Sequence, residues 1–162
     1  VINMENFEIE RKYLVKNDSW KNLNLLPIKI TQGYILNTKN KSIRIRICES
    51  ILNKAYITIK MSTGDNLIRK EFEYEIPFKD AIELLNTCED KISKNRYVLD
   101  KDGFKYEIDE IIEKNLGLVV VEIELKNENE SPTILDFIGE EITYDNKYIN
   151  ASLALNPYTS WI

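Results

Sequence analysis

Charged residues stand two positions apart at several places in this 162-residue chain, and their types suit the binding of a charged ligand. The series are Glu8, Glu10 and Lys12; Arg44 and Arg46; Arg69, Glu71 and Glu73; Lys94 and Arg96; and Glu122 and Glu124. Carboxylate oxygens are the usual ligands of hard divalent cations, whereas guanidinium and ammonium groups hold phosphate oxygens. The pattern therefore favours a metal-bound polyphosphate as the ligand, because it would engage both kinds of side chain.

Spacing of two residues is typical of β-strands, in which alternate side chains share a face. We expect eight strands, at Phe7–Val15, Lys29–Leu36, Ser42–Cys48, Lys54–Met61, Leu67–Ile76, Lys94–Asp100, Gly103–Asp109 and Gly117–Lys126. A half-exposed strand also alternates charged and apolar residues. Here, however, the charged faces are segregated by residue type, whereas a face that serves only solubility would mix the two signs.

Three helices and one short helical segment complete the expected elements. The helices are Pro77 to about Asp90, Ser131 to about Gly139 with Pro132 behind its cap, and Asp145 to about Leu155; the short segment is capped by Asp18 or Ser19. Helices need an apolar surface to cover, so we expect them outside the sheet and the charged faces inside. The sequence therefore predicts a single domain over residues 4–162 with a β-dominated α+β fold, an eight-stranded antiparallel closed β-barrel or tunnel with a polar, charged interior and helices packed outside.

Composition excludes several classes of function. The chain has no histidine, which rules out an imidazole base, a Ser–His pair and a His metal ligand. Its formal charge of −5 disfavours binding of a nucleic-acid duplex through bulk positive charge. Cys48 and Cys88 lack CxxC spacing, and no segment reaches the roughly 20 apolar residues of a membrane span, so we expect a cytoplasmic location without membrane contact. Val1–Asn3, which precede Met4, are expected to be an added or upstream extension.

Several short motifs follow one another along the chain. They are Glu8-Ile9-Glu10-Arg11-Lys12, Gln32-Gly33-Tyr34, Arg44-Ile45-Arg46, Thr58-Ile59-Lys60, Arg69 to Glu73, Lys94 to Tyr97, Asp109, Gly117 to Glu124 and Tyr148-Ile149-Asn150. Together they resemble the motifs of the CYTH superfamily, also called triphosphate tunnel metalloenzymes. The first matches its ExExK opening and the second its QGYL element, with Ile35 in place of Leu. The resemblance extends from about Glu5 to Trp161, and the C-terminal residues resemble those of the short bacterial members.

The resemblance implies a tunnel that hydrolyses or cyclises a triphosphate with Mg²⁺ or Mn²⁺. It implies metal ligands at Glu8, Glu10, Glu122 and Glu124, with Glu71, Glu73 and Asp109 binding metal or neutralising cations. It implies phosphate contacts from Lys12, Arg44, Arg46, Lys60, Arg69, Lys94, Arg96 and Lys147. Tyr34 and Lys94 resemble a pair near the attacking water, and cation crowding should lower the pKa of Lys94 enough for it to act as a base. For Glu75 and Glu107 a role in the site and a rim or structural position are equally open.

The expected function is metal-dependent hydrolysis of a triphosphate, with inorganic tripolyphosphate as substrate and orthophosphate as product. Nucleoside or thiamine triphosphatase activity, class IV-type adenylate cyclase activity and a non-catalytic polyphosphate- or nucleotide-binding module are the alternatives. The clustered carboxylates disfavour a binding module, because an anion binder does not require them. The expected partner is a small-molecule triphosphate, bound by a monomer or a homodimer.

Overall fold

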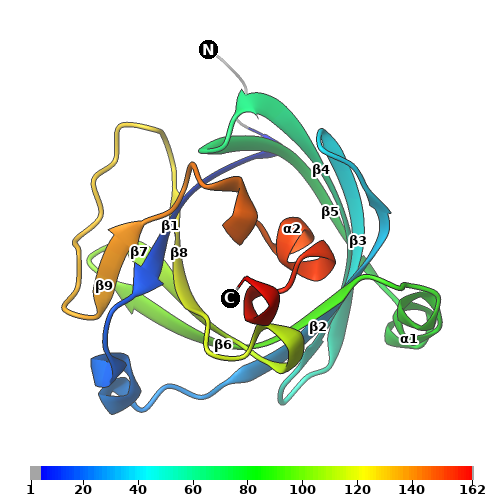
Figure 1. Ribbon diagram of the computed structural model, residues 1–162, viewed down its shortest axis with the longest axis horizontal. Helices are drawn as coiled ribbons and strands as arrows, with labels where there is room; N and C mark the ends of the chain where they lie inside the picture. Colours follow the sequence, from blue (N-terminus) through cyan, green and yellow to red (C-terminus); the bar gives the residue numbers. More distant parts are fainter. Residues whose placement is uncertain (1–4, 162) are drawn as a thin grey trace.

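The computed structural model describes residues 5–161, in which one antiparallel sheet closes on itself (Figure 1). Its strands are β1 (Phe7–Val15), β2 (Ile28–Asn37), β3 (Lys41–Glu49), β4 (Lys54–Asp65), β5 (Ile68–Ile76), β6 (Lys91–Lys101), β7 (Phe104–Ile111) and β8 (Val119–Leu125). They follow the order β5-β4-β3-β2-β6-β7-β8-β1, and pairing of β1 with β5 completes the ring. The predicted eight-stranded barrel is confirmed, and the expected extension Val1–Asn3 lies outside the described residues.

The alternation in the sequence corresponds to the two faces of the barrel wall. Ile45, Ile108 and Ile123 point outward and are completely buried beneath outer layers. The charged residues between them point inward, where Lys94 and Asp109 are also completely buried. The interior of the barrel is therefore polar and charged, as predicted.

Two helical elements cover apolar parts of the outer surface. The helix α1 (Phe78–Asn86), which is shorter than predicted, lies over β3 and β4, with Leu85 packed in the same core cluster as Ile45. Away from α1 in Figure 1, the 3-10 helix η1 (Asp18–Leu23) places Trp20 in the core cluster outside β1, β7 and β8. Outer packing thus stabilises separate parts of the ring.

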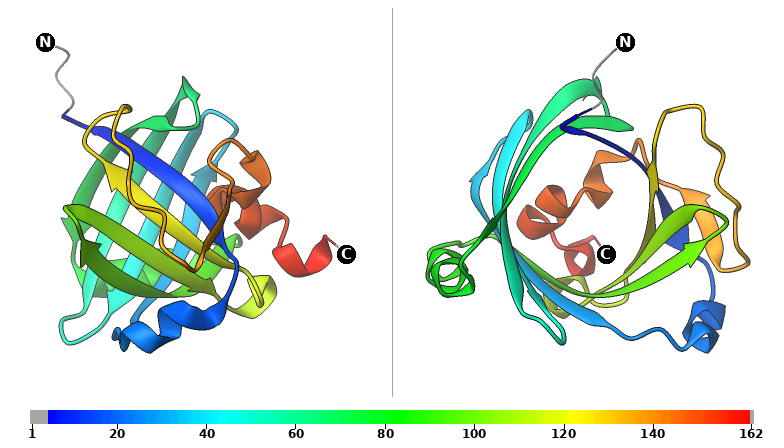
Figure 2. Two further views of the ribbon diagram at one scale, coloured as in Figure 1. Left: turned by 90° about the vertical axis from the view of Figure 1, so that its left-hand side faces the viewer. Right: turned by 180° about the vertical axis from the view of Figure 1, so that it is seen from behind.

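The C-terminal helical elements do not lie outside, which differs from the prediction. They are η3 (Asn146–Tyr148), α2 (Asn150–Leu155) and η4 (Tyr158–Ser160). Figures 1 and 2 show that they cover one end of the barrel. Leu153 of α2 is completely buried in a cluster with Ile92, Ile111 and Val120, which stand on the charged faces of their strands. The tunnel therefore has an apolar floor at this end.

The helix predicted for Ser131–Gly139 is wrong. That segment is irregular up to Ile138, where a ninth strand, β9 (Ile138–Glu141), pairs with β1 outside the ring. β5 pairs with β1 only over Phe7–Ile9, so the far end of that edge of β1 is left for β9. Phe137 and Ile138 are buried in the outer cluster over β1. Edge pairing and apolar burial outweigh the local N-cap and proline signals.

Side-chain caps also differ from expectation. Asn17 caps η1, because its side chain accepts the amide N–H of Ser19 at 2.9 Å, in place of the expected Asp18 or Ser19. Asp145 does act as a cap, but of η3, where it accepts the amide N–H of Lys147 at 3.2 Å. The single helix predicted after Asp145 is thus divided into two short elements.

One further 3-10 turn, η2 (Glu113–Asn115), joins β7 to β8. Within residues 5–161, no helix has both the length and the apolar character needed to cross a membrane. Cys48 and Cys88 are both free cysteines. Cys88 lies just beyond α1, directly over β2.

The contact between Cys88 and β2 requires glycine at position 33. A Cβ atom on Gly33 would lie 2.7 Å from Cβ and 2.9 Å from Sγ of Cys88. We predict that Gly33→Ala lowers the free energy of unfolding by about 1–3 kcal/mol through overpacking. Chemical denaturation measures this loss. The same change should have a smaller effect in a Cys88→Gly background, and equal losses in both backgrounds would contradict the explanation.

Candidate active site

A cavity of about 210 Å³ lies inside the barrel, walled by the charged inner face. The predicted residues that line it are Glu8, Glu10, Lys12, Tyr34, Arg44, Arg46, Lys60, Arg69, Glu71, Glu73, Arg96, Glu122 and Glu124. Three other predicted residues, Lys94, Asp109 and Lys147, are not among its lining residues. The structure therefore gathers most of the predicted set around one space.

The barrel places a basic wall opposite an acidic wall. β3, which carries Arg44 and Arg46, and β8, which carries Glu122 and Glu124, are four strands apart around the ring in either direction. Figure 1 shows these two strands on opposite sides of the interior. A ligand between them would meet cations on one side and carboxylates on the other.

The acidic wall brings like charges together. In the strand register Glu10 lies opposite Glu124, and Glu107 lies opposite Glu122. Directly opposed like charges destabilise a sheet. The carboxylates of Glu10, Glu107 and Glu122 also offer ligand oxygens that all lie within 4.8 Å of one another. This spacing and the all-oxygen donor set suit a hard divalent cation.

Of these three carboxylates, Glu10 is the one whose charge is not balanced by an ion-pair partner in the described part of the chain. Among residues 5–161 its side chain has no hydrogen-bond or ion-pair partner. Burial, together with the neighbouring charges of Glu122 and Glu8, raises the pKa of Glu10 well above its usual value. A cation bound beside it would remove that repulsion, so the acidic wall fits a metal site.

Glu122 is compensated by cations from two sides. Lys12 Nζ lies 3.1 Å from Glu122 Oε1 and donates to the backbone oxygen of Tyr148 at 2.9 Å. Arg96 Nη2 lies 3.5 Å from Glu122 Oε2. Burial opposes ionisation, but Lys12, Lys94 and Arg96 together bring the pKa of Glu122 well below its usual value. Glu122 is therefore a permanent carboxylate at the centre of the site.

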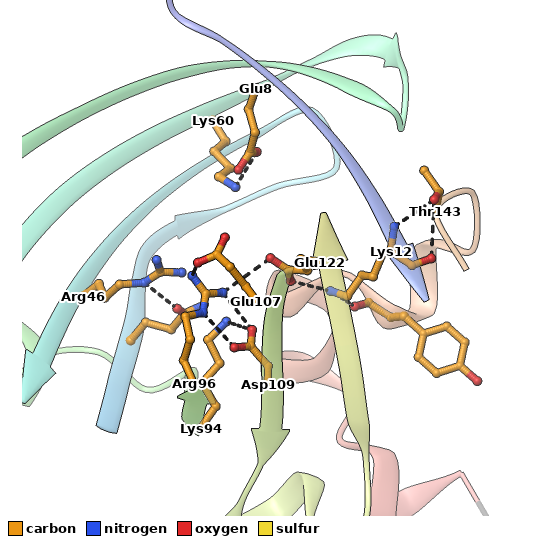
Figure 3. A network of polar contacts seen from close by, with 12 residues as sticks. Glu8, Lys12, Arg46, Lys60, Lys94, Arg96, Glu107, Asp109, Glu122 and Thr143 are labelled. Carbon is orange, nitrogen blue, oxygen red and sulfur yellow. Dashed lines mark hydrogen bonds and ion pairs between the residues drawn. The ribbon is translucent and has the colours of Figure 1, made fainter. Parts of the chain in front are cut away.

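Arg96 is the hub of the buried network shown in Figure 3. Its Nε and Nη2 donate to the two oxygens of Asp109 at 2.7 and 2.8 Å, a bidentate pair across adjacent strands. Its Nη1 donates to Glu107. Burial opposes the charge of Asp109, yet Arg96 and Lys94 keep the pKa of that carboxyl below its usual value. Asp109 thus serves as a counter-ion in this arrangement, one of the two roles that the sequence left open.

Lys94 lies behind the cavity wall. It is completely buried, and its ammonium donates to Asp109 Oδ2. Burial and the charge of Arg96 lower the pKa of Lys94 to about 8. The predicted depression of this pKa is confirmed, and its causes are burial first and then the neighbouring cation.

The Glu8 end of the site is held by Lys60. Lys60 Nζ donates to Glu8 Oε2 at 2.8 Å and lies 3.2 Å from Glu71 Oε2. Burial opposes the ionisation of Glu8, whereas Lys60 lowers its pKa below the usual value. Glu73 accepts a hydrogen bond from Thr58 at 2.8 Å and lies 3.5 Å from Arg44. Glu8, Glu71 and Glu73 are therefore closer to being counter-ions than Glu10 is.

Several cations on the cavity wall have no carboxylate partner. Within the part of the chain that the structure describes, the side chains of Arg69 and Lys105 form no ion pair or hydrogen bond, and Arg46 bonds only to Gln32. Arg44 Nε is buried without a hydrogen-bond partner. Burial and the charges of Arg44 and Arg96 lower the pKa of Arg46. Such a crowded, unneutralised group of cations suits an anion with many oxygens.

Two residues considered from the sequence lie at the edge of the site. Lys147 is not among the residues that line the cavity. Its ammonium lies 3.7 Å from Asp145 Oδ2 and about 5 Å from the rings of Tyr148 and Trp161. For Glu107 the sequence left a role in the site and a rim or structural position equally open. Its carboxylate lines the cavity and lies close to those of Glu10 and Glu122.

Lys105 and Asn150 also line the cavity and were not among the predicted site residues. Alternation placed Lys105 on the inner face, and Asn150 belongs to the Tyr148-Ile149-Asn150 motif. The Asn150 Oδ1 atom is buried without a hydrogen-bond partner. Both residues extend the polar lining of the site.

Comparison with known proteins covers almost the whole chain. The model of the CYTH domain matches residues 6–153. A curated inorganic triphosphatase of Acetivibrio thermocellus is 42% identical over 156 residues, which span 95% of this chain and 97% of that protein. An inorganic triphosphatase of Nitrosomonas europaea is 32% identical over 153 residues, spanning 92% and 97%. A solved structure of an inorganic triphosphatase has a TM-score of 0.62 at 29% identity, covering 91% of this chain and 94% of the other.

The uncompensated charge of Glu10 leads to a prediction about stability. The pKa of Glu10 is higher in the folded protein than in the unfolded chain, so folding disfavours the ionised carboxylate. The free energy of unfolding therefore falls as the pH rises from the unfolded-state pKa through the folded-state pKa. At neutral pH and without metal, Glu10→Gln should therefore raise the free energy of unfolding by roughly 0.2–1 kcal/mol. Mg²⁺ or Mn²⁺ should stabilise the unsubstituted protein and stabilise Glu10→Gln much less.

Thermal unfolding with a chelator and with each metal measures both effects. Glu83→Gln is the matched control, because Glu83 is exposed on α1 outside the barrel. A Glu10→Gln protein that is less stable without metal, and equally stabilised by metal, would contradict the role of Glu10.

Proposed function

The chain belongs to the CYTH domain family, and from this premise we propose that it is a metal-dependent triphosphatase acting on inorganic tripolyphosphate and releasing orthophosphate. The observation that carries the proposal is the facing pair of walls, Arg44 and Arg46 on β3 and Glu122 and Glu124 on β8. The name inorganic triphosphatase, borne by the curated relatives, supports the same substrate. The chain is accordingly a hydrolase of phosphoric anhydrides.

The cavity cations that form no short ion pair are the proposed phosphate contacts. Arg44, Arg46, Arg69 and Lys105 can approach the substrate without breaking a strong ion pair. Among residues 5–161, their one contact with a carboxylate is the 3.5 Å approach of Arg44 to Glu73. Phosphoryl transfer depends mainly on positioning and on stabilisation of charge. A guanidinium fork can hold two phosphate oxygens at once, and lysine adds a point charge. The partnered cations, such as Lys12 and Lys60, would act chiefly by holding the carboxylates in place.

The acidic wall is the proposed metal site. Glu10, Glu107 and Glu122 are close enough to hold one ion, and Glu124 lies opposite Glu10 in the strand register. When bound there, Mg²⁺ or Mn²⁺ would neutralise phosphate charge and favour ionisation of a bound water. The carboxylates supply only oxygen ligands, in keeping with both metals.

Lys94 is the proposed base for the attacking water. No histidine is present, and the pKa of about 8 leaves part of the Lys94 population neutral near physiological pH. Asp109 holds the amine in a defined position through a buried hydrogen bond. Since Lys94 lies behind the wall, the role requires a substrate-bound water within hydrogen-bond reach of Nζ.

Other triphosphates and other outcomes are distinguishable by one panel of assays. We expect orthophosphate release from tripolyphosphate with Mg²⁺ or Mn²⁺, and slower release from ATP and thiamine triphosphate. Pyrophosphate with a cyclic nucleotide would indicate a cyclase, and tight binding without turnover would indicate a binding module. Loss of the metal ligand in Glu124→Ala should reduce turnover at least about 100-fold, whereas Glu83→Ala should not change it.

A second prediction concerns Lys94. Lys94→Ala should lower kcat about 100-fold or more, as for loss of a general base, with little change in KM. Lys94→Arg keeps the positive charge but cannot act as a base at neutral pH, so it should be similarly inactive. Steady-state kinetics with tripolyphosphate, with circular dichroism to check folding, measures both. Near-normal turnover of Lys94→Ala would remove Lys94 as the base, and high activity of Lys94→Arg would make it a charge contact.

A further inference from the structure

Gln32 joins two residues that line the cavity, Arg46 and Tyr34. It lies on β2 and is completely buried. Arg46 Nε donates to Gln32 Oε1 at 3.0 Å, and Gln32 Nε2 donates to the hydroxyl oxygen of Tyr34 at 3.1 Å. In the register of β2 and β3, Gln32 lies opposite Arg46, and Tyr34 lies opposite Arg44. A single buried amide therefore links a basic residue with an aromatic hydroxyl.

The chemistry of the three groups sets the direction of each hydrogen bond. A guanidinium can only donate, so the amide oxygen of Gln32 must face Arg46. The amide nitrogen then faces Tyr34 and can only donate. The Tyr34 oxygen is consequently an acceptor in this contact, and its own proton is free to point elsewhere.

The Tyr34 proton has no acceptor in the described part of the protein. The hydroxyl oxygen receives the bond from Gln32, and residues 5–161 provide no oxygen or nitrogen that accepts from it. Tyr34 is only 7% exposed and lines the cavity. A hydroxyl proton in this position needs an acceptor, which can be water in the cavity or an oxygen of a bound ligand.

A neutral amide also preserves the charge of Arg46. A glutamate at position 32 would form a buried ion pair with Arg46 and would accept the Tyr34 proton as well. Glutamine instead holds the guanidinium by Nε, and the two Nη groups form no hydrogen bond with any residue of the described range 5–161. The side chain thus orients both groups without neutralising the charge of Arg46.

We propose that Gln32 is a positioning residue that directs two donors, the Arg46 guanidinium and the Tyr34 hydroxyl, toward the phosphate oxygens of the bound triphosphate. The inference rests on the proposed triphosphatase function. It assigns Tyr34 the role of a hydrogen-bond donor to the substrate, and it leaves proton acceptance from the water to another group. No covalent step passes through Gln32.

A double-mutant cycle between Gln32 and Tyr34 tests the proposal. Gln32→Leu and Tyr34→Phe should each raise KM for tripolyphosphate about 10-fold, as expected for loss of a hydrogen bond to a charged group, with a smaller change in kcat. The double variant should lose much less than the product of the single losses, because Gln32 acts partly through Tyr34. Gln32→Glu should raise KM further, since it withdraws both donors.

The readouts separate positioning from a structural effect. Partial unfolding would lower kcat through fewer active molecules and leave KM unchanged. Asn17→Asp is the matched amide-to-acid control, because Asn17 caps η1 on the outer surface. The KM of this variant should equal that of the unsubstituted protein. If the Gln32 variants fail to fold, Tyr34→Phe alone decides, and an unchanged KM for it overturns the inference. Fully multiplicative losses in the cycle also overturn it.

Failure of the proposed function would be visible separately. If the unsubstituted protein turns over tripolyphosphate and the cycle is multiplicative, only the positioning role is wrong. If it binds tripolyphosphate without turnover, the triphosphatase assignment is wrong, and calorimetric Kd values measured over the same cycle test Gln32. If it neither binds nor hydrolyses tripolyphosphate, both are wrong.

Discussion

Compensation of charge inside a closed barrel is the constraint on which the rest of the structure depends. Buried ions cost several kcal/mol each unless they are paired and hydrogen-bonded. Arg96 contributes three of these pairs, since it contacts Asp109, Glu107 and Glu122 on the two strands that follow β6 in the ring. These contacts hold only in the observed register, because a slip of one residue would turn every charged side chain to the apolar outer face.

Compensation is incomplete in two regions of the interior, and those regions form the binding site. Among residues 5–161, Arg46 on β3 has no carboxylate partner and Arg44 has only the 3.5 Å contact with Glu73, while Glu10 on the acidic wall has no ion-pair partner. A protein that neutralised all of its interior charges would have no electrostatic reason to bind an anion or a metal. Here the remaining charges have opposite signs on opposite walls, so a phosphate chain and its metal complete what the protein leaves unpaired. The apolar floor beneath α2 limits the polar space to the rest of the tunnel.

The sequence predicted the barrel well and its additions poorly. Alternation reports the environment of each strand directly, so the inward direction of Arg44 and Glu122 could be inferred without a structure. The segment Ser131–Gly139 carried a local helix signal, but it forms irregular chain and the start of β9, since the exposed edge of β1 lies far away in the sequence. The position of α2 over one end of the barrel was equally invisible to local patterns.

The sequence by itself determined which residues face the interior and which sign each strand carries, because a period of two is a local property of the backbone. Only the tertiary structure decided which of those residues meet. Ring closure placed β3 opposite β8, buried Lys94 against Asp109, added Glu107 to the carboxylate cluster and left Lys147 outside the cavity. Those outcomes depend on strand order and register between distant segments, and no short-range spacing contains that information.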